Sequence, residues 1–469
     1  MRITFLLALA LSLFGSTATA QNEQDTTTDR PASSGILEEA PSLEGVIPVE
    51  MRQDDEGNWT LYRGGEPYYI RGAGGIQFMD RAIAYGANSV RTWGAGEAIS
   101  ILDEAHELGL SVVFGLWVGM DRQGFDYNDT KSVEAQLARF REVVREYKDH
   151  PAILMWGVGN EVDLFYEDFK VWDAINDIAE MIKEEDPHHP TMTVTAGLDV
   201  AEIQLIMERA PAIDIMGINT YGELVGGTRE FRTYGYDGPS VGTTLRRAGW
   251  DGPYIIAEWG PDGHWEVPRT SWGVPIEQTS TEKARVYRLR YERGIAADSA
   301  RCIGSYAFLW GEKQETTPTW YGIFTPGGYE TQVMDELEYV WTGSYPENRA
   351  PQLDALTANG QDAFASVYVE PREVVTFFAD VTDPEGKPIR YDWELLPEST
   401  DIRAGGDAET RPDAVDLDIV SGEDGEINVR VPRREGPYRM FIYAYDDSGN
   451  VATANIPFYI GSPEQASAR

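Results

Sequence analysis

The chain has 469 residues, of which 42% are hydrophobic, so it is long enough to form more than one domain with its own core. Its 78 acidic residues outnumber 39 lysines and arginines, and the formal net charge of −39 argues against nucleic acid or anionic lipid as a partner. The single cysteine, Cys302, leaves no intrachain disulfide to form, and its apolar neighbours predict a small core residue.

The N-terminal segment is predicted to be a secretion signal. It combines a basic Arg2, an apolar run over residues 3–14 and an A-x-A motif that ends at Ala20. The apolar run is too short for a permanent transmembrane anchor, although an uncleaved anchor is the alternative. We therefore expect a signal peptide at 1–20, a flexible polar leader at 21–49, and a secreted or periplasmic protein that is free of the membrane after cleavage.

From about residue 50 the sequence alternates between strand-like apolar runs and segments with helical periodicity. Eight such strands predict a (β/α)8 TIM barrel over residues 50–345. An open, doubly wound sheet is the alternative, but no glycine-rich nucleotide motif follows the first strand. Strands are expected at 68–75, 88–94, 110–119, 152–162, 191–197, 213–222, 253–260 and 302–311, and helices at 97–109, 133–150, 171–187, 201–211, 280–298 and 331–341.

Residues 346–462 have a different pattern. Short alternating strands, separated by Pro, Gly and Asp turns, predict an all-β, immunoglobulin-like sandwich without a cysteine pair. The DDSGN turn at 446–450 has residues that can bind calcium, but we favour a hairpin turn there. The predicted fold class is therefore α/β, with a barrel followed by a C-terminal sandwich.

Two carboxylates each close an apolar strand of the predicted barrel. Glu161 follows ILMWGVGN, and Glu258 follows PYIIA. The carboxyl ends of barrel strands meet at one mouth, so both side chains are expected there. A pair of carboxylates is the minimal apparatus for glycosidic bond cleavage, because one protonates the leaving oxygen while the other attacks the anomeric carbon or activates a water.

Polar and aromatic side chains end the other strands. Asn160 can hydrogen-bond a sugar hydroxyl, while Arg91 and Tyr221 can donate to the attacking carboxylate and keep it ionised. Tryptophan faces suit the C–H faces of sugar rings. The predicted substrate-binding residues are Arg91, Trp93, Trp117, Asn160, Asn219, Tyr221, Trp259, His264 and Trp310.

Two loops are candidate walls of the substrate site. The loop at 260–277 carries His264, Trp265 and Trp272, and the loop at 313–324 carries Gln314, Glu315, Trp320 and Tyr321. Asp163 and Asp262 are expected to be solvated loop charges.

The order Arg91, Asn160-Glu161, Tyr221, Glu258, Trp310 resembles clan A of the glycoside hydrolases. The local sequences GEPYYIRG, ANSVRTWG, HPAILMWGVGNEV, GINTYG and PYIIAEWG are similar to the catalytic barrel of family 2, over about residues 58–342. The resemblance implies that Glu161 is the general acid/base and Glu258 the nucleophile of a retaining double displacement.

The chain departs from the family pattern in one respect. Family 2 enzymes usually carry β-domains before the barrel, whereas the predicted sandwich follows it here. This puts the typical galactoside and glucuronide substrates in doubt, and an open, aromatic cleft favours a polysaccharide, with β-glucan as the leading guess. The hydrolase has two alternatives. One is a transglycosylase with the same residues, and the other is a non-catalytic carbohydrate-binding barrel.

The five histidines do not gather at the predicted mouth, where only His264 is well placed. We therefore expect no catalytic metal and no cofactor. An oligo- or polysaccharide is the expected partner, and the sequence does not predict the oligomeric state.

Overall fold

The computed structural model describes residues 45–96, 98–225 and 239–467. The predicted signal peptide lies outside the described residues, as does the predicted leader up to residue 44. Within the described ranges, no helix is both long and apolar enough to cross a membrane.

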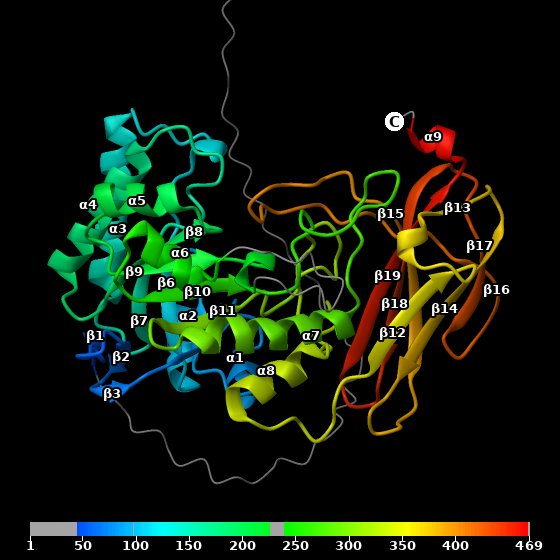
Figure 1. Cartoon of the computed structure of the whole chain (residues 1–469), viewed down its shortest axis with the longest axis horizontal. Coiled ribbons are helices and arrows are strands. Elements are labelled where there is room, and N and C mark those ends of the chain that lie inside the picture. The colour runs from blue at the N-terminus through cyan, green and yellow to red at the C-terminus, as the bar shows by residue number, and fades with distance from the viewer. Residues whose placement is uncertain (1–44, 97, 226–238, 468–469) are drawn as a thin grey trace, which may run out of the picture. The chain divides into compact units, whose positions relative to one another are not determined.

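Eight parallel strands close into a barrel in the order β10-β11-β4-β5-β6-β7-β8-β9 (Figure 1). This confirms the predicted TIM barrel. Nearly every strand residue is buried, as expected when helices cover the outer face and side chains fill the interior. The strands are β4 (Ile70–Gly74), β5 (Ser89–Arg91), β6 (Ser111–Leu116), β7 (Ile153–Val158), β8 (Thr191–Ala196), β9 (Ile215–Asn219), β10 (Tyr254–Trp259) and β11 (Cys302–Ala307).

The helices between the strands include all six that the periodicity predicts. Two further helices, α1 and α6, have only six and eight residues, which is too short for a helical period to be recognised in the sequence. α7 begins with a capping box between Thr279 and Glu282. The helices are α1 (Met79–Ala84), α2 (Ala98–Glu107), α3 (Thr130–Tyr147), α4 (Lys170–Glu185), α5 (Val200–Arg209), α6 (Val241–Ala248), α7 (Ser280–Arg290) and α8 (Val333–Thr342), with short turns η1 (Asp121–Gln123), η2 (Gly222–Leu224), η3 (Tyr291–Ile295) and η4 (Ala296–Asp298).

A small antiparallel sheet, which the sequence did not predict, precedes the barrel. It consists of β1 (Val49–Gln53), β2 (Trp59–Arg63) and β3 (Glu66–Pro67). Its apolar residues join the core cluster of the barrel interior. The Val49 N–H donates to the His188 carbonyl, which precedes β8. The sheet therefore covers the barrel end opposite the mouth.

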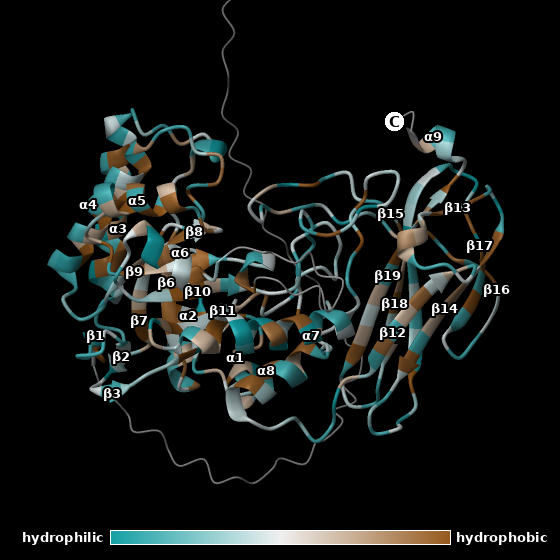
Figure 2. Ribbon diagram, viewed as in Figure 1, coloured by the Kyte–Doolittle hydropathy of each residue, from teal (hydrophilic) through white to brown (hydrophobic). Residues whose placement is uncertain are grey.

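The C-terminal strands form two four-stranded sheets around one apolar core, which confirms the predicted sandwich. Figure 2 shows apolar residues along these strands as well as in the barrel. The DDSGN segment is a hairpin turn in which the Asp446 carboxylate accepts backbone N–H groups of Ser448 and Asn450. One sheet contains β12 (Gln352–Ala358), β14 (Val374–Thr382), β17 (Glu426–Arg430) and β16 (Asp418–Glu423), and the other β13 (Val367–Val369), β19 (Val451–Ile460), β18 (Gly436–Tyr445) and β15 (Arg390–Pro397), with η5 (Ala363–Ala365) and α9 (Pro463–Ser467) outside them.

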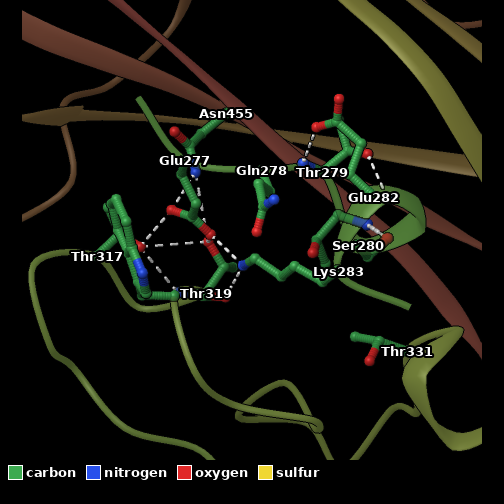
Figure 3. Close-up of polar contacts among 12 residues, drawn as sticks. Glu277, Gln278, Thr279, Ser280, Glu282, Lys283, Thr317, Thr319, Thr331 and Asn455 are labelled. Atoms are coloured by element: carbon green, nitrogen blue, oxygen red, sulfur yellow. Dashed lines mark hydrogen bonds and ion pairs between the residues drawn. The ribbon is translucent and has the colours of Figure 1, made fainter. Parts of the chain in front are cut away.

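A buried polar network joins the sandwich to the barrel (Figure 3). Glu277, in the loop after β10, accepts from Lys283 of α7 at 2.6 Å and from Asn455 of β19 at 2.6 Å. Thr317 and Thr319 of the loop after β11 donate to the same carboxylate. Separating the domains would leave buried charges and hydrogen-bonding groups without partners, which is strongly unfavourable. The network therefore holds the sandwich against the mouth loops of the barrel.

Candidate active site

Both predicted catalytic carboxylates lie at the carboxyl ends of barrel strands. Glu258 is within β10, and Glu161 comes three residues after β7 ends at Val158. The chain turns at Gly159, with φ of +78°, and Glu161 itself has φ of +49°. Left-handed backbone is uncommon for glutamate and is often found at functional sites. The apolar strand therefore ends before the carboxylate, which reaches the mouth on a turn.

Three hydrogen-bond donors converge on the carboxylate of Glu258. Trp93 Nε1 lies 2.7 Å and Arg91 Nη1 3.1 Å from Oε1, while the Tyr221 hydroxyl lies 3.2 Å from Oε2. Glu258 is 5% exposed and Arg91 only 2%. Charge-assisted hydrogen bonds of this kind stabilise the ionised carboxylate and fix its orientation. The environment suits a nucleophile.

Glu161 has a different environment. Asn219 Nδ2 donates to its Oε1 at 2.8 Å, and no lysine or arginine of the described residues forms an ion pair with it. Burial, together with the negative charge of Glu258, raises the pKa of Glu161 to about 8, and the Asn219 hydrogen bond and the Arg91 charge only partly offset this. Glu161 is therefore protonated near neutral pH. Two carboxyl groups in opposite states are what acid–nucleophile chemistry requires.

Two asparagines connect the carboxylates to Arg91. Asn160 Oδ1 accepts from Arg91 Nη2 at 2.7 Å and from Asn219 Nδ2 at 3.2 Å. Its Oδ1 is thus fully used, while its Nδ2 has no acceptor among the described residues and can donate to a ligand. Because these residues come from the ends of β5, β7 and β9, the closed barrel places the predicted polar set together.

An aromatic cluster borders these carboxylates. Phe308 lies edge-on to Trp93 at 5.9 Å between ring centroids, and Tyr221 contacts Trp265 at 5.7 Å. Trp265 is 56% exposed and Trp117 36%, so both have faces open to a ligand. Phe308 was not among the predicted site residues, because Trp310, two residues later, was chosen as the aromatic residue that ends this strand.

The prediction that Trp259 and Trp310 contact the substrate is wrong. Trp259 and Trp310 are both fully buried in the apolar core. Successive strand residues point to opposite faces, so Glu258 at the mouth places Trp259 on the helix side, where it packs against Tyr287. Trp310 packs against Phe324 and Trp341.

Other loop residues also differ from expectation. Trp272 packs against Tyr368 and Tyr459 of the sandwich instead of lining a substrate wall. Asp163 is half-buried rather than solvated; its partial desolvation raises its pKa to about 7, and its carboxylate accepts the Ala196 N–H. Asp262 is 3% exposed and pairs with Arg290, so it too is not a solvated charge.

His264 lies at the predicted loop, with its ring against Trp265 and Trp320. Burial, with the charge of Arg269 as a second cause, lowers the pKa of His264 to about 4, so the ring is neutral at physiological pH. Two acids that do not end a strand, the half-buried Glu266 and the buried Glu315, add to the mouth. Glu266 accepts N–H groups of the neighbouring loops, and Glu315 is close enough to Glu258 for the two charges to interact.

The family model of the glycosyl hydrolases family 2 TIM barrel domain matches residues 77–233. A β-galactosidase from Thermoanaerobacter pseudethanolicus (strain ATCC 33223 / 39E) is 31% identical over 173 residues, which cover 33% of this chain and 22% of that protein. The matched part of the barrel is therefore similar to the family 2 TIM barrel domain.

The chain is also similar in fold to solved β-glucuronidases. The Bacteroides uniformis enzyme is 14% identical with a TM-score of 0.47, covering 88% of this chain and 48% of the other. The Dictyoglomus thermophilum enzyme is 18% identical with a TM-score of 0.47, covering 64% and 54%. The chain thus spans about half the length of these structures and about a fifth of the β-galactosidase.

The matched segment of the family 2-like barrel contains the Arg91, Asn160-Glu161 and Asn219 part of the site but ends before Glu258. The assignment of the second carboxylate therefore rests on geometry. Within the described residues, no group of three or more His, Cys, Asp or Glu side chains is arranged to hold a metal ion.

Proposed function

We propose that this protein is a retaining β-glycoside hydrolase, with Glu258 as nucleophile and Glu161 as general acid/base. The observation that carries the proposal is the contrast between the two carboxyl groups. Three donors converge on Glu258, whereas burial keeps Glu161 protonated. Acid and nucleophile must differ in this way at one pH.

The proposed reaction has two displacements. Glu258 attacks the anomeric carbon while Glu161 gives its proton to the glycosidic oxygen, which releases the aglycone and leaves a glycosyl ester. Glu161, now a carboxylate, then takes a proton from the water that attacks the same carbon. The free Nδ2 of Asn160 is positioned to donate to a sugar hydroxyl, since its Oδ1 is held by Arg91 and Asn219.

The charges of the mouth favour a neutral sugar. Glu266 is half-buried and Glu315 is buried beside the reacting pair, so the mouth holds four carboxyl groups when Glu161 and Glu258 are included. In their ionised form Glu266 and Glu315 repel the carboxylate of a uronic acid, whereas they accept hydrogen bonds from the hydroxyls of a neutral hexose. We therefore propose a neutral β-hexoside, a class that includes the substrate in the name of the β-galactosidase relative. A β-glucan stays a prediction within this class, as does export through residues 1–20.

The test is product analysis of the purified protein with a panel of aryl β-glycosides and β-linked glucans, mannan, xylan and galactan. Proton NMR at early times gives the anomer that is released first. We expect the β-anomer from the wild type and no product from Glu258→Ala. Glu167→Gln, in an exposed loop residue, is the matched control and should keep full activity.

Release of the α-anomer would overturn the double displacement. Binding of a glycan without turnover, by a folded protein, would support the non-catalytic barrel instead. Products longer than the supplied oligosaccharide would indicate transglycosylation through the same ester.

A further inference from the structure

A loop of the sandwich reaches the mouth of the barrel. The connection between β15 and β16 includes Asp407, whose carboxylate pairs with Arg122 at 2.8 Å and accepts from Gln123 Nε2 at 3.0 Å. Arg122 also donates to the Ala404 carbonyl at 3.4 Å. Arg122 and Gln123 belong to η1, which follows β6, so this contact is on the catalytic side of the barrel.

The same loop is attached to a second part of the mouth. Lys313 Nζ donates to the Gly406 carbonyl at 2.6 Å, and the Thr316 N–H donates to Glu409 at 2.6 Å. Lys313 and Thr316 follow β11. Around the closed barrel, β4 and β5 lie between β11 and β6. A segment fixed to both loops therefore crosses the mouth beside β4 and β5.

Two glycines let the segment pass closely. Gly405 and Gly406 have φ of +63° and +67°, which side chains rarely adopt. A Cβ on Gly405 would lie 2.6 Å from Arg122 Nη2 and 3.0 Å from Leu164 Cδ2. Leu164 is three residues beyond Glu161, on the loop after β7, and β7 is opposite β11 in the barrel. The segment thus contacts loops on opposite sides of the mouth.

Each end of the segment contacts a side chain that in turn contacts a residue at the mouth. Gln123, which Asp407 fixes, accepts from Nε1 of the exposed Trp117 at 3.4 Å. Lys313, which the Gly406 carbonyl fixes, pairs with Glu315 at 2.8 Å, and the charge of Glu315 acts on Glu258. The segment is therefore connected, through one side chain at each end, to the exposed ring of Trp117 and to Glu315 of the mouth.

We propose that segment 404–409 of the sandwich forms one end of the substrate site, so that a β-linked chain stops against it instead of passing through the mouth. The proposal rests on the proposed function. It assigns the C-terminal domain a part in substrate selection, in place of the open cleft that the sequence suggested. The enzyme would then remove one or a few sugars from a chain end. Asp407 and Glu409 are positioning residues, because they act through Arg122, Gln123 and the loop after β11.

The test compares wild type with the Asp407→Ala/Glu409→Ala double variant. Asp413→Ala is the matched control, since Asp413 is an exposed acid of the same loop that makes no hydrogen bond or ion pair in the described structure. Substrates are an activated aryl β-glycoside with one sugar and a ladder of β-linked oligosaccharides from the best polymer. For each variant kcat, KM and product lengths are measured, and thermal unfolding reports whether the fold is intact.

For the double variant we expect KM for oligosaccharides to rise about tenfold more than KM for the aryl glycoside, together with longer products. The control should match wild type. If the double variant does not fold, Gly405→Ala takes its place, because the added Cβ crowds Arg122 without removing a charge. This variant should shift product lengths in the same direction.

An unchanged product ladder in a folded double variant would overturn the inference while leaving the proposed function intact. Equal losses on both substrates, with a lower melting temperature, would mean that the segment only stabilises the fold and would also overturn it. Failure of the wild type to cleave any glycoside would refute the proposed function and, with it, this inference.

Discussion

Replacing Trp93 with phenylalanine tests how the protein holds its proposed nucleophile. The change removes the Nε1–H that lies 2.7 Å from Glu258 Oε1 but keeps an aromatic ring against Phe308. A hydrogen bond to a charged group contributes about 1.5–3 kcal/mol. Arg91 Nη1 remains 3.1 Å from the same oxygen, and Trp93 is partly exposed, so we expect the lower end of that range. At about 1.4 kcal/mol for each tenfold, kcat/KM should fall by about ten- to thirtyfold.

The assay is kcat/KM on an activated aryl β-glycoside, with active sites counted by a mechanism-based inactivator. Tyr221→Phe is the comparison, because its hydroxyl lies at the longer distance of 3.2 Å from the other carboxylate oxygen. The loss should be smaller for Tyr221→Phe than for Trp93→Phe. Wild-type activity in Trp93→Phe, or a larger loss in Tyr221→Phe, would refute the argument from donor distance.

Three further predictions concern titratable groups. Because the pKa of Glu161 is raised to about 8, activity should decline above pH 8. Glu161→Gln should abolish this decline in the pH profile. The variant should lose most activity on substrates with poor leaving groups. Azide should restore turnover to Glu258→Ala with inverted product, measured by NMR, whereas rescue with retention would reverse the two roles. Burial raises the pKa of Asp335 to about 8, so the folded state binds this proton more tightly than the unfolded state and stability falls as pH rises from about 4 to 8. Asp335→Asn should remove this decline, with a gain in melting temperature at pH 8 that is absent at pH 4; an equal effect at both pH values would contradict it.

The barrel could be predicted because its strands are continuous apolar runs and its longer helices have clear periodicity. The polar site residues were found for the same reason, since strand ends such as those at Arg91 and Glu258 meet in any closed barrel. The aromatic residues were less predictable. Whether a tryptophan faces the mouth depends on strand phase, which placed Trp259 on the helix side, and on the loop path after β11, which selected Phe308 over Trp310.

Contacts between the domains could not be predicted from sequence. The pairs Glu277–Asn455 and Arg122–Asp407 join residues 178 and 285 positions apart, and no local pattern marks either one. The partial burial of Asp163 was missed for a related reason, because nothing in its loop sequence indicates that the Ala196 N–H donates to its carboxylate. Long-range packing decides these details.

The most direct test of the central claim is to trap the glycosyl-enzyme. A 2-deoxy-2-fluoro β-glycoside of the best sugar, with a good leaving group, should add one sugar to the protein, as measured by intact mass. Peptide mapping should place it on Glu258. The account predicts this single adduct, its absence from Glu258→Ala, and slow release of the sugar with retained configuration. An adduct on Glu161, or turnover of the parent glycoside with inversion and no adduct, would contradict it.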